Sequence, residues 1–229
     1  TQFAPVTAAV IHALRKAKVI VRYGIGYDNV DCKAAAARGI PVCNVPDFCI
    51  DEVADHTLAM ILEVTRKIAL SWLSIRRGEW KLPFPLEQMF ALKKRTVGLV
   101  AYGKIAKEVA LRLKNFKCRI MVHDPFVEDA VIRRDGFLPA ALEELYAESD
   151  LLSLHCPSSD QTKYMINSDS IRKMKKGVIL VNCSRGTLVK TPDLVEALQN
   201  GRISAAALDV TDPEPLPPDH PLLKMDNVV

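Results

Sequence analysis

Short apolar runs that alternate with longer amphipathic stretches are the feature that most limits how this chain can fold. The runs are apolar along their whole length, as buried strands are, and the stretches between them have helix-like spacing. Such strands, each followed by a helix, predict a parallel sheet covered by helices on both faces. The runs are Val19–Tyr23, Thr96–Val100, Arg119–His123, Leu151–His155, Val178–Asn182 and Ala205–Val210, and Asn227–Val229 resembles the beginning of another.

The longest helical pattern extends from Asp51 to Trp80, with apolar side chains at the spacing of one helix face. It separates an early strand–helix portion from the later series of strands and helices. We therefore expect a domain boundary near its start. A second clear helix follows Thr191, the expected N-cap, with Pro192 in the first helical position.

Composition and charge exclude several classes of protein. The chain has 229 residues, of which 49% are hydrophobic and 25% charged, an ordinary balance for a domain with a buried core. The net charge of +4 is not gathered in a basic patch, so we expect no nucleic-acid partner. No apolar run approaches the ~20 residues that span a bilayer. The six cysteines are dispersed and lack metal-ligand spacing, which favours reduced thiols in a cytoplasmic protein without a bound metal.

The turn after Val100 has the spacing of a dinucleotide-binding loop, with one departure. In such a loop, one small residue allows a sharp turn, a second lets the backbone approach a pyrophosphate, and a third lets the helix pack closely on the strand. Gly103 and Ala106 meet the last two requirements, but Ala101 stands where a glycine is expected. Its Cβ costs roughly 1 kcal/mol if the backbone adopts a left-handed angle. A purely structural strand-to-helix turn is the alternative.

A carboxylate at the end of the next run adds a second element of the same site. Asp124 follows Gly103 by 21 residues, where a ribose-binding acid is expected. It can accept hydrogen bonds from both ribose hydroxyls, and it would repel the 2′-phosphate of NADP. The alternative is an Asp-Pro turn that merely ends the strand. Together the loop and the carboxylate favour NAD as the cofactor.

Five further stretches resemble the D-isomer-specific 2-hydroxyacid dehydrogenase family, in the family's order and over essentially the whole chain. They read YGIGYDNVD (Tyr23–Asp31), VPDFCIDEVADHTLAMIL (Val45–Leu62), LHCPSSDQTKYMIN (Leu154–Asn167), NCSRGTLV (Asn182–Val189) and AALDVTDPEPLP (Ala206–Pro217). The second stretch and the RRGEW that follows it look most like the subgroup that includes the C-terminal-binding-protein corepressors. The resemblance implies an α/β fold. Residues 1–50 would be the remnant of a flavodoxin-like, substrate-binding domain, and 51–229 a Rossmann doubly wound parallel sheet that binds NAD.

The resemblance also implies an activity, the interconversion of a D-2-hydroxy acid and a 2-oxo acid by hydride transfer with NAD. Arg185 matches the arginine that holds the substrate carboxylate and polarises its ketone. Glu214 matches the acid that pairs with the catalytic histidine. Ile25 and Gly26 match a turn whose backbone N–H groups bind the substrate carboxylate. Without the resemblance, these residues would equally suit a strand-end salt bridge, a solvated acid and a glycine turn.

The implied cofactor contacts lie after the apolar runs, where α/β folds bind ligands. They are Tyr102, Gly103, Lys104 and Ile105 at the pyrophosphate, Asp124 on the ribose, His155, Cys156, Pro157 and Thr162 along the adenosine and phosphate edge, and Cys183, Ser184, Arg185 and Asp209 near the nicotinamide. His155 is expected to line the adenosine site and not to move protons. His56, in the long helix, is expected to be a packing or interface residue.

The family's proton donor is a histidine in a Thr-Pro-His stretch, and it is expected after the run that begins at Asn227. The printed chain stops at Val229, so we expect the natural protein to extend further, as we also expect before Thr1. His220 lies in a proline-rich loop and does not take this role. Without the histidine the chain would only bind NAD, and the rival interpretation is an NAD(H)-sensing, corepressor-like protein with little or no turnover. A homodimer through the long helix and the RRGEWK arm is expected in either case.

Overall fold

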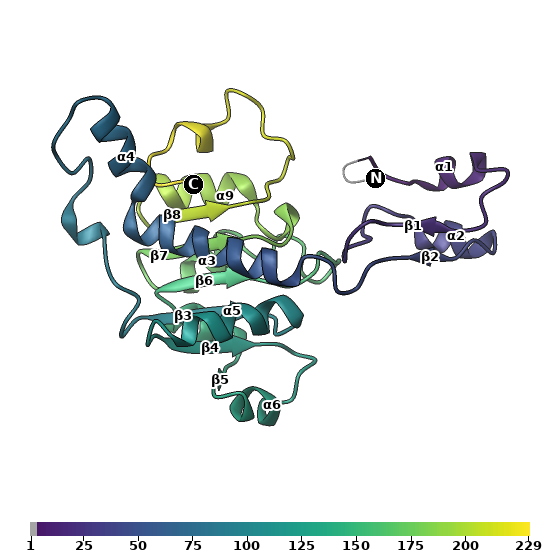
Figure 1. Ribbon diagram of the computed structural model, residues 1–229, viewed down its shortest axis with the longest axis horizontal. Coiled ribbons are helices and arrows are strands. Elements are labelled where there is room, and N and C mark those ends of the chain that lie inside the picture. The colour runs from purple at the N-terminus through teal and green to yellow at the C-terminus, as the bar shows by residue number, and fades with distance from the viewer. Residues whose placement is uncertain (1–3) are drawn as a thin grey trace. The chain divides into compact units, whose positions relative to one another are not determined.

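The protein is described by a computed structural model over residues 4–229 (Figure 1). The chain forms two compact units that divide between Ile50 and Asp51. Each unit has its own parallel sheet, with two strands in the first unit and six in the second. In residues 4–229, no helix is long and apolar enough to cross a membrane. The same residues contain no cluster of three His, Cys, Asp or Glu side chains that could hold a metal ion.

The first unit contains two short helices and two short strands. They are α1 (Ala8–Ala13), β1 (Ile20–Val21), α2 (Cys32–Ala37) and β2 (Val42–Cys43), and the two strands pair in parallel. Ile11, Ala35 and Ile40 form its buried core. Strand β2 is absent from the predicted runs because two residues are too few to produce a recognisable pattern.

The second unit is a doubly wound parallel sheet, which confirms the predicted fold class. Its strands are β3 (Thr96–Val100), β4 (Arg119–His123), β5 (Leu138–Pro139), β6 (Leu151–Leu154), β7 (Val178–Asn182) and β8 (Ile203–Leu208). Their order in the sheet is β5-β4-β3-β6-β7-β8, so the chain winds outward first to one edge and then to the other. This is the order of a Rossmann fold. Val229 pairs with Ala206 of β8 through its backbone, as expected for the beginning of another strand.

Helices cover both faces of this sheet. On one face lie α3 (Ile50–Arg66), α5 (Lys104–Lys114) and α6 (Asp129–Arg134), and on the other α7 (Leu142–Glu148), α8 (Ser168–Lys173) and α9 (Thr191–Gln199) (Figure 1). Within β7, Ile179 and Val181 pack into the first core, whereas Val178 and Leu180 pack into the second. Because alternate side chains of a strand point to opposite faces, both sets must be apolar, which explains the continuous runs.

The prediction of one helix from Asp51 to Trp80 is wrong. The helix breaks at Lys67, which has a φ of 56° in the left-handed region, and α4 (Ile68–Arg76) follows. A non-glycine residue there costs roughly 1–2 kcal/mol. The Glu63 carboxylate offsets part of that cost, because it accepts a hydrogen bond from the Ala69 N–H at 2.9 Å.

The predicted cap of α9 is also wrong by one residue. The N-cap is Lys190, and Thr191 is the first helical residue. The Thr191 hydroxyl donates instead to the carbonyl oxygen of Asp212, in the loop after β8. A tertiary contact has therefore taken the side chain away from its local role.

Short 3₁₀ turns complete the fold at η1 (Leu86–Gln88), η2 (Gly186–Leu188) and η3 (Pro221–Lys224).

Candidate active site

The predicted residues of the second unit gather at one edge of its sheet. They follow the carboxyl ends of β3, β4, β6, β7 and β8, and because these strands are parallel their carboxyl ends share an edge. Strands β3 and β6 are neighbours from which the chain winds in opposite directions. Ligands of open α/β sheets bind outside the carboxyl ends at such a point.

The turn between β3 and α5 has the geometry of an anion site. Ala101 has a φ of 76°, the left-handed angle for which glycine is the usual residue. Gly103 is the N-cap of α5 and makes no side-chain cap, and a Cβ built on it would meet no atom within 4 Å. The space beside the start of this helix is therefore open. The first N–H groups and the dipole of α5 favour a negative group there, so a diphosphate fits.

Asp124 lies directly beside this turn. Its carboxylate accepts a hydrogen bond from the Tyr102 N–H at 2.7 Å and another from the Phe126 N–H at 2.8 Å. The side chain is half-buried. A carboxylate has about four lone-pair sites, so Asp124 keeps capacity for the two hydroxyls of a ribose. The contact brings together two elements that lie far apart in the sequence.

The Tyr102 side chain is buried in the core. It is 2% exposed and packs edge-on against Phe137 with ring centroids 6.1 Å apart. Its hydroxyl donates to Asp135 at 3.0 Å, and burial together with this hydrogen bond raises the pKa of the phenol well above its usual range. Only the backbone of Tyr102 faces the turn. Lys104 is exposed and Ile105 is half-buried against the first core.

Burial favours the uncharged forms of His155 and Cys156, which follow β6. Burial lowers the pKa of His155 to about 4, and its Nε2 lies 3.0 Å from the Ser153 hydroxyl. The imidazole is therefore uncharged at neutral pH. Burial also raises the pKa of Cys156 to about 11, so this side chain is a thiol and not a nucleophilic thiolate.

The loop from Pro157 to Thr162 is closed by its own side chains. The Thr162 hydroxyl donates to the Pro157 carbonyl at 2.6 Å and accepts from the Ser159 N–H at 2.8 Å. The Ser158 hydroxyl lies 2.7 Å from that of Thr187, which follows β7. The loops that follow β6 and β7, which carry predicted cofactor contacts, are thus joined to each other.

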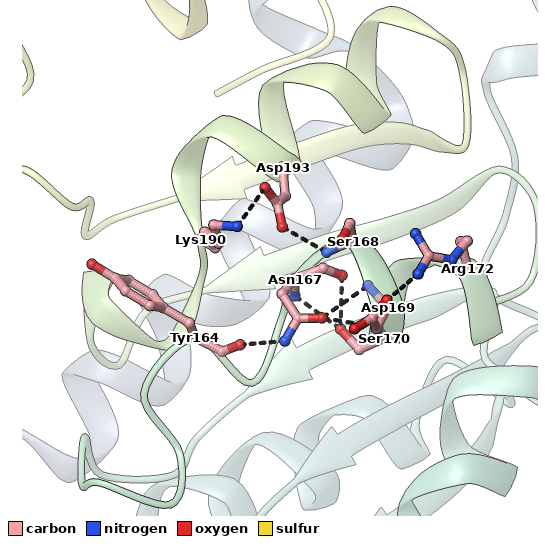
Figure 2. A network of polar contacts seen from close by, with 8 residues as sticks. All are labelled: Tyr164, Asn167, Ser168, Asp169, Ser170, Arg172, Lys190 and Asp193. Atoms are coloured by element: carbon pink, nitrogen blue, oxygen red, sulfur yellow. Dashed lines mark hydrogen bonds and ion pairs between the residues drawn. The ribbon is translucent and has the colours of Figure 1, made fainter.

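A capping network anchors the far end of the same loop (Figure 2). The Asn167 side chain accepts from the Ser170 N–H at 3.1 Å and donates to the Tyr164 carbonyl at 2.8 Å. Asp193, at the start of α9, accepts from the Ser168 N–H at 2.7 Å and pairs with Lys190 at 3.2 Å. The starts of α8 and α9 are therefore joined behind the loop, which is a structural role.

Asn182 holds the turn that carries Arg185, and it was not among the predicted residues. It is fully buried at the end of β7, where its amide oxygen accepts from the Ser184 N–H at 3.1 Å. Its amide nitrogen donates to the Arg185 carbonyl at 2.9 Å. The half-buried Arg185 guanidinium donates to the Ser184 carbonyl at 2.7 Å. A polar residue that closes an apolar run is the signal that could have identified Asn182.

Gly186 connects this turn to the loop that carries Glu214. A Cβ on Gly186 would lie 1.8 Å from the Thr211 carbonyl oxygen, so only glycine allows this approach. Asp212 accepts from the Tyr164 hydroxyl at 2.8 Å and is followed by a cis peptide bond, as is Glu214. Glu214 is exposed on a loop whose base is fixed against η2. The structure therefore brings the Glu214 loop next to the Arg185 turn.

His56 belongs to this edge, where the sequence predicted only a packing or interface residue. Its Nε2 lies 3.1 Å from Oδ1 of Asp209, and the two side chains are 48% and 49% exposed. Cys183 contacts Thr57 and interacts with Asp209, and burial raises the pKa of its thiol to about 11. His56 and Asp209 are 153 residues apart, so no local pattern could have paired them.

Ile25 and Gly26 are described within the first unit. The Ile25 carbonyl accepts from the Asn44 side chain at 2.8 Å, and the preceding Gly24 carbonyl accepts from the Val45 N–H at 3.1 Å. Both residues are half-buried. Within the described residues, no hydrogen bond uses the N–H of Ile25 or Gly26. These two donors are therefore available to a carboxylate.

Known proteins resemble the chain along nearly its full length. The profile described as D-isomer specific 2-hydroxyacid dehydrogenase, NAD binding domain, matches residues 58–229. A glyoxylate reductase of Korarchaeum cryptofilum is 39% identical over 227 residues, which are 98% of this chain and 68% of the relative. A D-3-phosphoglycerate dehydrogenase of Archaeoglobus fulgidus is 38% identical over 98% of this chain and 42% of its own length.

Solved structures agree with this relationship. The crystal structure of a glyoxylate reductase from Paecilomyes thermophila superposes with a TM-score of 0.90 at 31% identity, covering 98% of this chain and 68% of the other. The profile supplies NAD as the cofactor, and the open space at Gly103 beside Asp124 fits it. The chain belongs to the D-isomer-specific 2-hydroxyacid dehydrogenases, a family of NAD-dependent oxidoreductases that act on hydroxy and oxo acids.

Proposed function

We propose that this NAD-dependent dehydrogenase interconverts a small D-2-hydroxy acid and its 2-oxo acid, with glyoxylate as the first substrate to test. The observation that carries the proposal is the 2.7 Å hydrogen bond between the Tyr102 N–H and Asp124, because it supports a ribose and a diphosphate bound side by side. NAD, when bound, supplies or accepts the hydride. The residues of the chain then need to bind, orient and protonate the acid.

Arg185 is the proposed substrate-orienting residue. Its planar guanidinium can hold a carboxylate with two parallel hydrogen bonds and place positive charge beside the ketone oxygen. The Asn182 side chain fixes the backbone on both sides of this position, which restricts the directions that the guanidinium can take. Within the first unit, the N–H groups of Ile25 and Gly26 are proposed as donors to a substrate carboxylate.

Glu214 is the proposed partner of the proton donor. A carboxylate bonded to an imidazole stabilises the imidazolium, so the histidine can give a proton to the carbonyl oxygen during reduction. From the resemblance to the family, we expect that histidine after Val229. We therefore propose cofactor binding for the chain as printed, and turnover for a protein whose chain includes the histidine.

Self-association through α4 and the following arm is part of the proposal. Trp72, Ile75 and Trp80 are 55%, 49% and 92% exposed in this region, an apolar surface suited to a second copy. Light scattering after size exclusion tests the homodimer, and a monomer at micromolar concentration would contradict it. A cytoplasmic location is proposed because none of the six cysteines is paired in a disulfide.

The activity is tested by NADH oxidation with glyoxylate, pyruvate, hydroxypyruvate and phosphohydroxypyruvate, alongside NADH binding followed by fluorescence. We expect the printed chain to bind NADH with micromolar affinity, and a chain extended through the histidine to oxidise NADH with at least one of the acids. Absence of NADH binding by the printed chain would refute the proposal. Binding by the extended chain without turnover would favour the NAD(H)-sensing alternative.

A further inference from the structure

The order of the strands limits where the second half of a bound NAD molecule can lie. Asp124 follows β4 and the diphosphate turn follows β3, whereas β6, β7 and β8 lie in that order on the other side of β3. A dinucleotide that places its adenosine over β4 therefore extends its nicotinamide over the carboxyl ends of β6, β7 and β8. An acidic residue, Asp209, directly follows β8 at this edge.

His56 is the side-chain partner of Asp209. Its Nε2 lies 3.1 Å from Oδ1 of Asp209, and because an ionised carboxylate only accepts hydrogen bonds, Nε2 is the donor. Among the described residues, His56 is the only side chain that hydrogen bonds to this carboxylate. A carboxylate has about four lone-pair sites, so Asp209 retains capacity for a donor on a ligand.

The His56–Asp209 pair is open to solvent. The two side chains are 48% and 49% exposed, so a ligand can reach the free positions of the carboxylate. An exposed pair of this kind contributes little to the free energy of unfolding. Loss of the His56 side chain should therefore leave the fold intact, and its consequence is expected at the ligand.

Both members of the pair are carried by backbone that is itself fixed. His56 belongs to α3, where its neighbours Ala54 and Thr57 are fully buried. The Asp209 N–H donates to the Asn182 carbonyl at 3.0 Å, which fixes the residue to the end of β7. A hydrogen bond between side chains on two fixed segments restricts the direction in which the Asp209 carboxylate points.

We propose that His56 is a positioning residue for the nicotinamide of NAD and acts through Asp209. The amide nitrogen of the nicotinamide carboxamide carries two donors, and the Asp209 carboxylate, held by His56, accepts from one of them. This contact fixes the rotation of the nicotinamide ring and therefore the ring face from which the hydride moves. The role rests on the dehydrogenase function proposed above, to which it adds a residue of α3.

The test compares NADH with reduced 3-acetylpyridine adenine dinucleotide, in which a methyl ketone replaces the carboxamide and removes both donors. Fluorescence titration of the printed chain measures each affinity. We expect the wild-type chain to bind NADH about fivefold more tightly than the analogue, and His56→Ala to remove this preference. His56→Gln should keep it, because the glutamine amide can still donate to Asp209. Arg66→Ala, which removes an exposed side chain from the other end of α3, should also keep it.

Two further measurements separate positioning from a general disturbance of the site. ADP-ribose, which lacks the nicotinamide, should bind equally well to the wild-type and His56→Ala chains. In an Asp209→Ala chain, His56→Ala should cause no further loss of NADH affinity, because its effect passes through the missing carboxylate.

Four results would overturn the role of His56. They are equal affinity of the wild-type chain for NADH and the analogue, an unchanged preference in His56→Ala, a lost preference in His56→Gln, and an additive loss in the double variant. Weaker binding of ADP-ribose by His56→Ala would also contradict it. Each of these results, with intact NADH binding by the wild-type chain, leaves the proposed dehydrogenase function in place. Absence of NADH binding by the wild-type chain would refute both.

Discussion

Polar side chains have different kinds of partner at the two edges of the six-stranded sheet. At the carboxyl edge, Asp124 accepts from the backbone of the neighbouring β3–α5 turn, whereas Asn182 and Thr162 donate to the backbone of their own loops. At the amino edge, Asp150 is compensated by hydrogen bonds from the Thr96 N–H at 2.8 Å and Lys175 at 2.6 Å. Lys67 is 5% exposed, and burial lowers its pKa although the charge of Glu63 opposes this shift. At both edges, therefore, polar side chains hold the fold through backbone or charged partners.

Gly186→Ala should have the largest effect, because the new methyl group would lie against the Thr211 carbonyl. We expect the free energy of unfolding to fall by about 3 kcal/mol, since the backbone at Thr211 must move to relieve the overlap. Urea denaturation measures the change. Gly177→Ala is the control at the amino edge, where no atom lies within 4 Å of the added Cβ, although its φ of 80° adds strain. Equal destabilisation by the two substitutions would show that the contact with Thr211 is unimportant.

Asp150→Asn should lower the free energy of unfolding by about 2 kcal/mol, because Lys175 and the Thr96 N–H lose a charged acceptor. NADH affinity should stay unchanged, since the residue lies at the opposite edge from the cofactor loop. A parallel loss of NADH affinity would contradict the separation of the two edges.

The Asp150 carboxylate should also make the free energy of unfolding depend on pH. Although burial opposes it, hydrogen bonds from Lys175 and the Thr96 N–H, with the charge of Arg95, lower the pKa of Asp150. A group whose pKa is depressed by folding contributes stability above its unfolded pKa of about 3.9. That contribution should disappear as the pH falls through the folded pKa. Acid titrations of wild-type and Asp150→Asn chains should therefore converge at low pH, and a constant gap would refute this account.

Asp124→Ala should weaken NADH binding by about tenfold, or about 1.4 kcal/mol, and improve NADPH binding relative to NADH. The carboxylate both accepts from the Tyr102 N–H and faces the expected ribose. Asp124→Asn is the matched variant, because it keeps an acceptor for that N–H but removes the negative charge. Fluorescence titrations with both cofactors measure the preference. A preference that stays with NADH in both variants would refute the role of Asp124 in cofactor choice.

Ala101→Gly should have the smallest effect and the opposite sign. Because Ala101 has a φ of 76°, glycine at this position should raise the free energy of unfolding by about 1 kcal/mol. NADH affinity should be unchanged or slightly higher. The control is Ala130→Gly on the exposed side of α6, which should destabilise by about 1 kcal/mol. Destabilisation by both substitutions would mean that the turn does not need a glycine-like angle.

Much of the second unit could be predicted from the sequence. Strands β3, β4 and β7 begin and end at the predicted residues, because strands buried on both faces require uninterrupted apolar side chains. The spacing from Gly103 to Asp124 predicted that the turn and the acid serve one cofactor, and the structure places Asp124 beside the turn, bonded to the Tyr102 N–H. Two-residue strands such as β2 and β5 leave no periodic pattern, so they were missed. The roles of the individual site residues and of residues 1–50 stay predictions.

The sequence by itself determined the type of sheet and the position of a small-residue turn and an acid after consecutive strands, because local periodicity and short spacing encode them. Only the tertiary structure decided how distant residues meet, as in the contact of His56 with Asp209. It also decided that Thr191 bonds to the loop after β8 instead of capping its helix, and that the long helix breaks at Lys67. Packing between segments far apart in the chain sets these features, and it overrides the local preference of each residue.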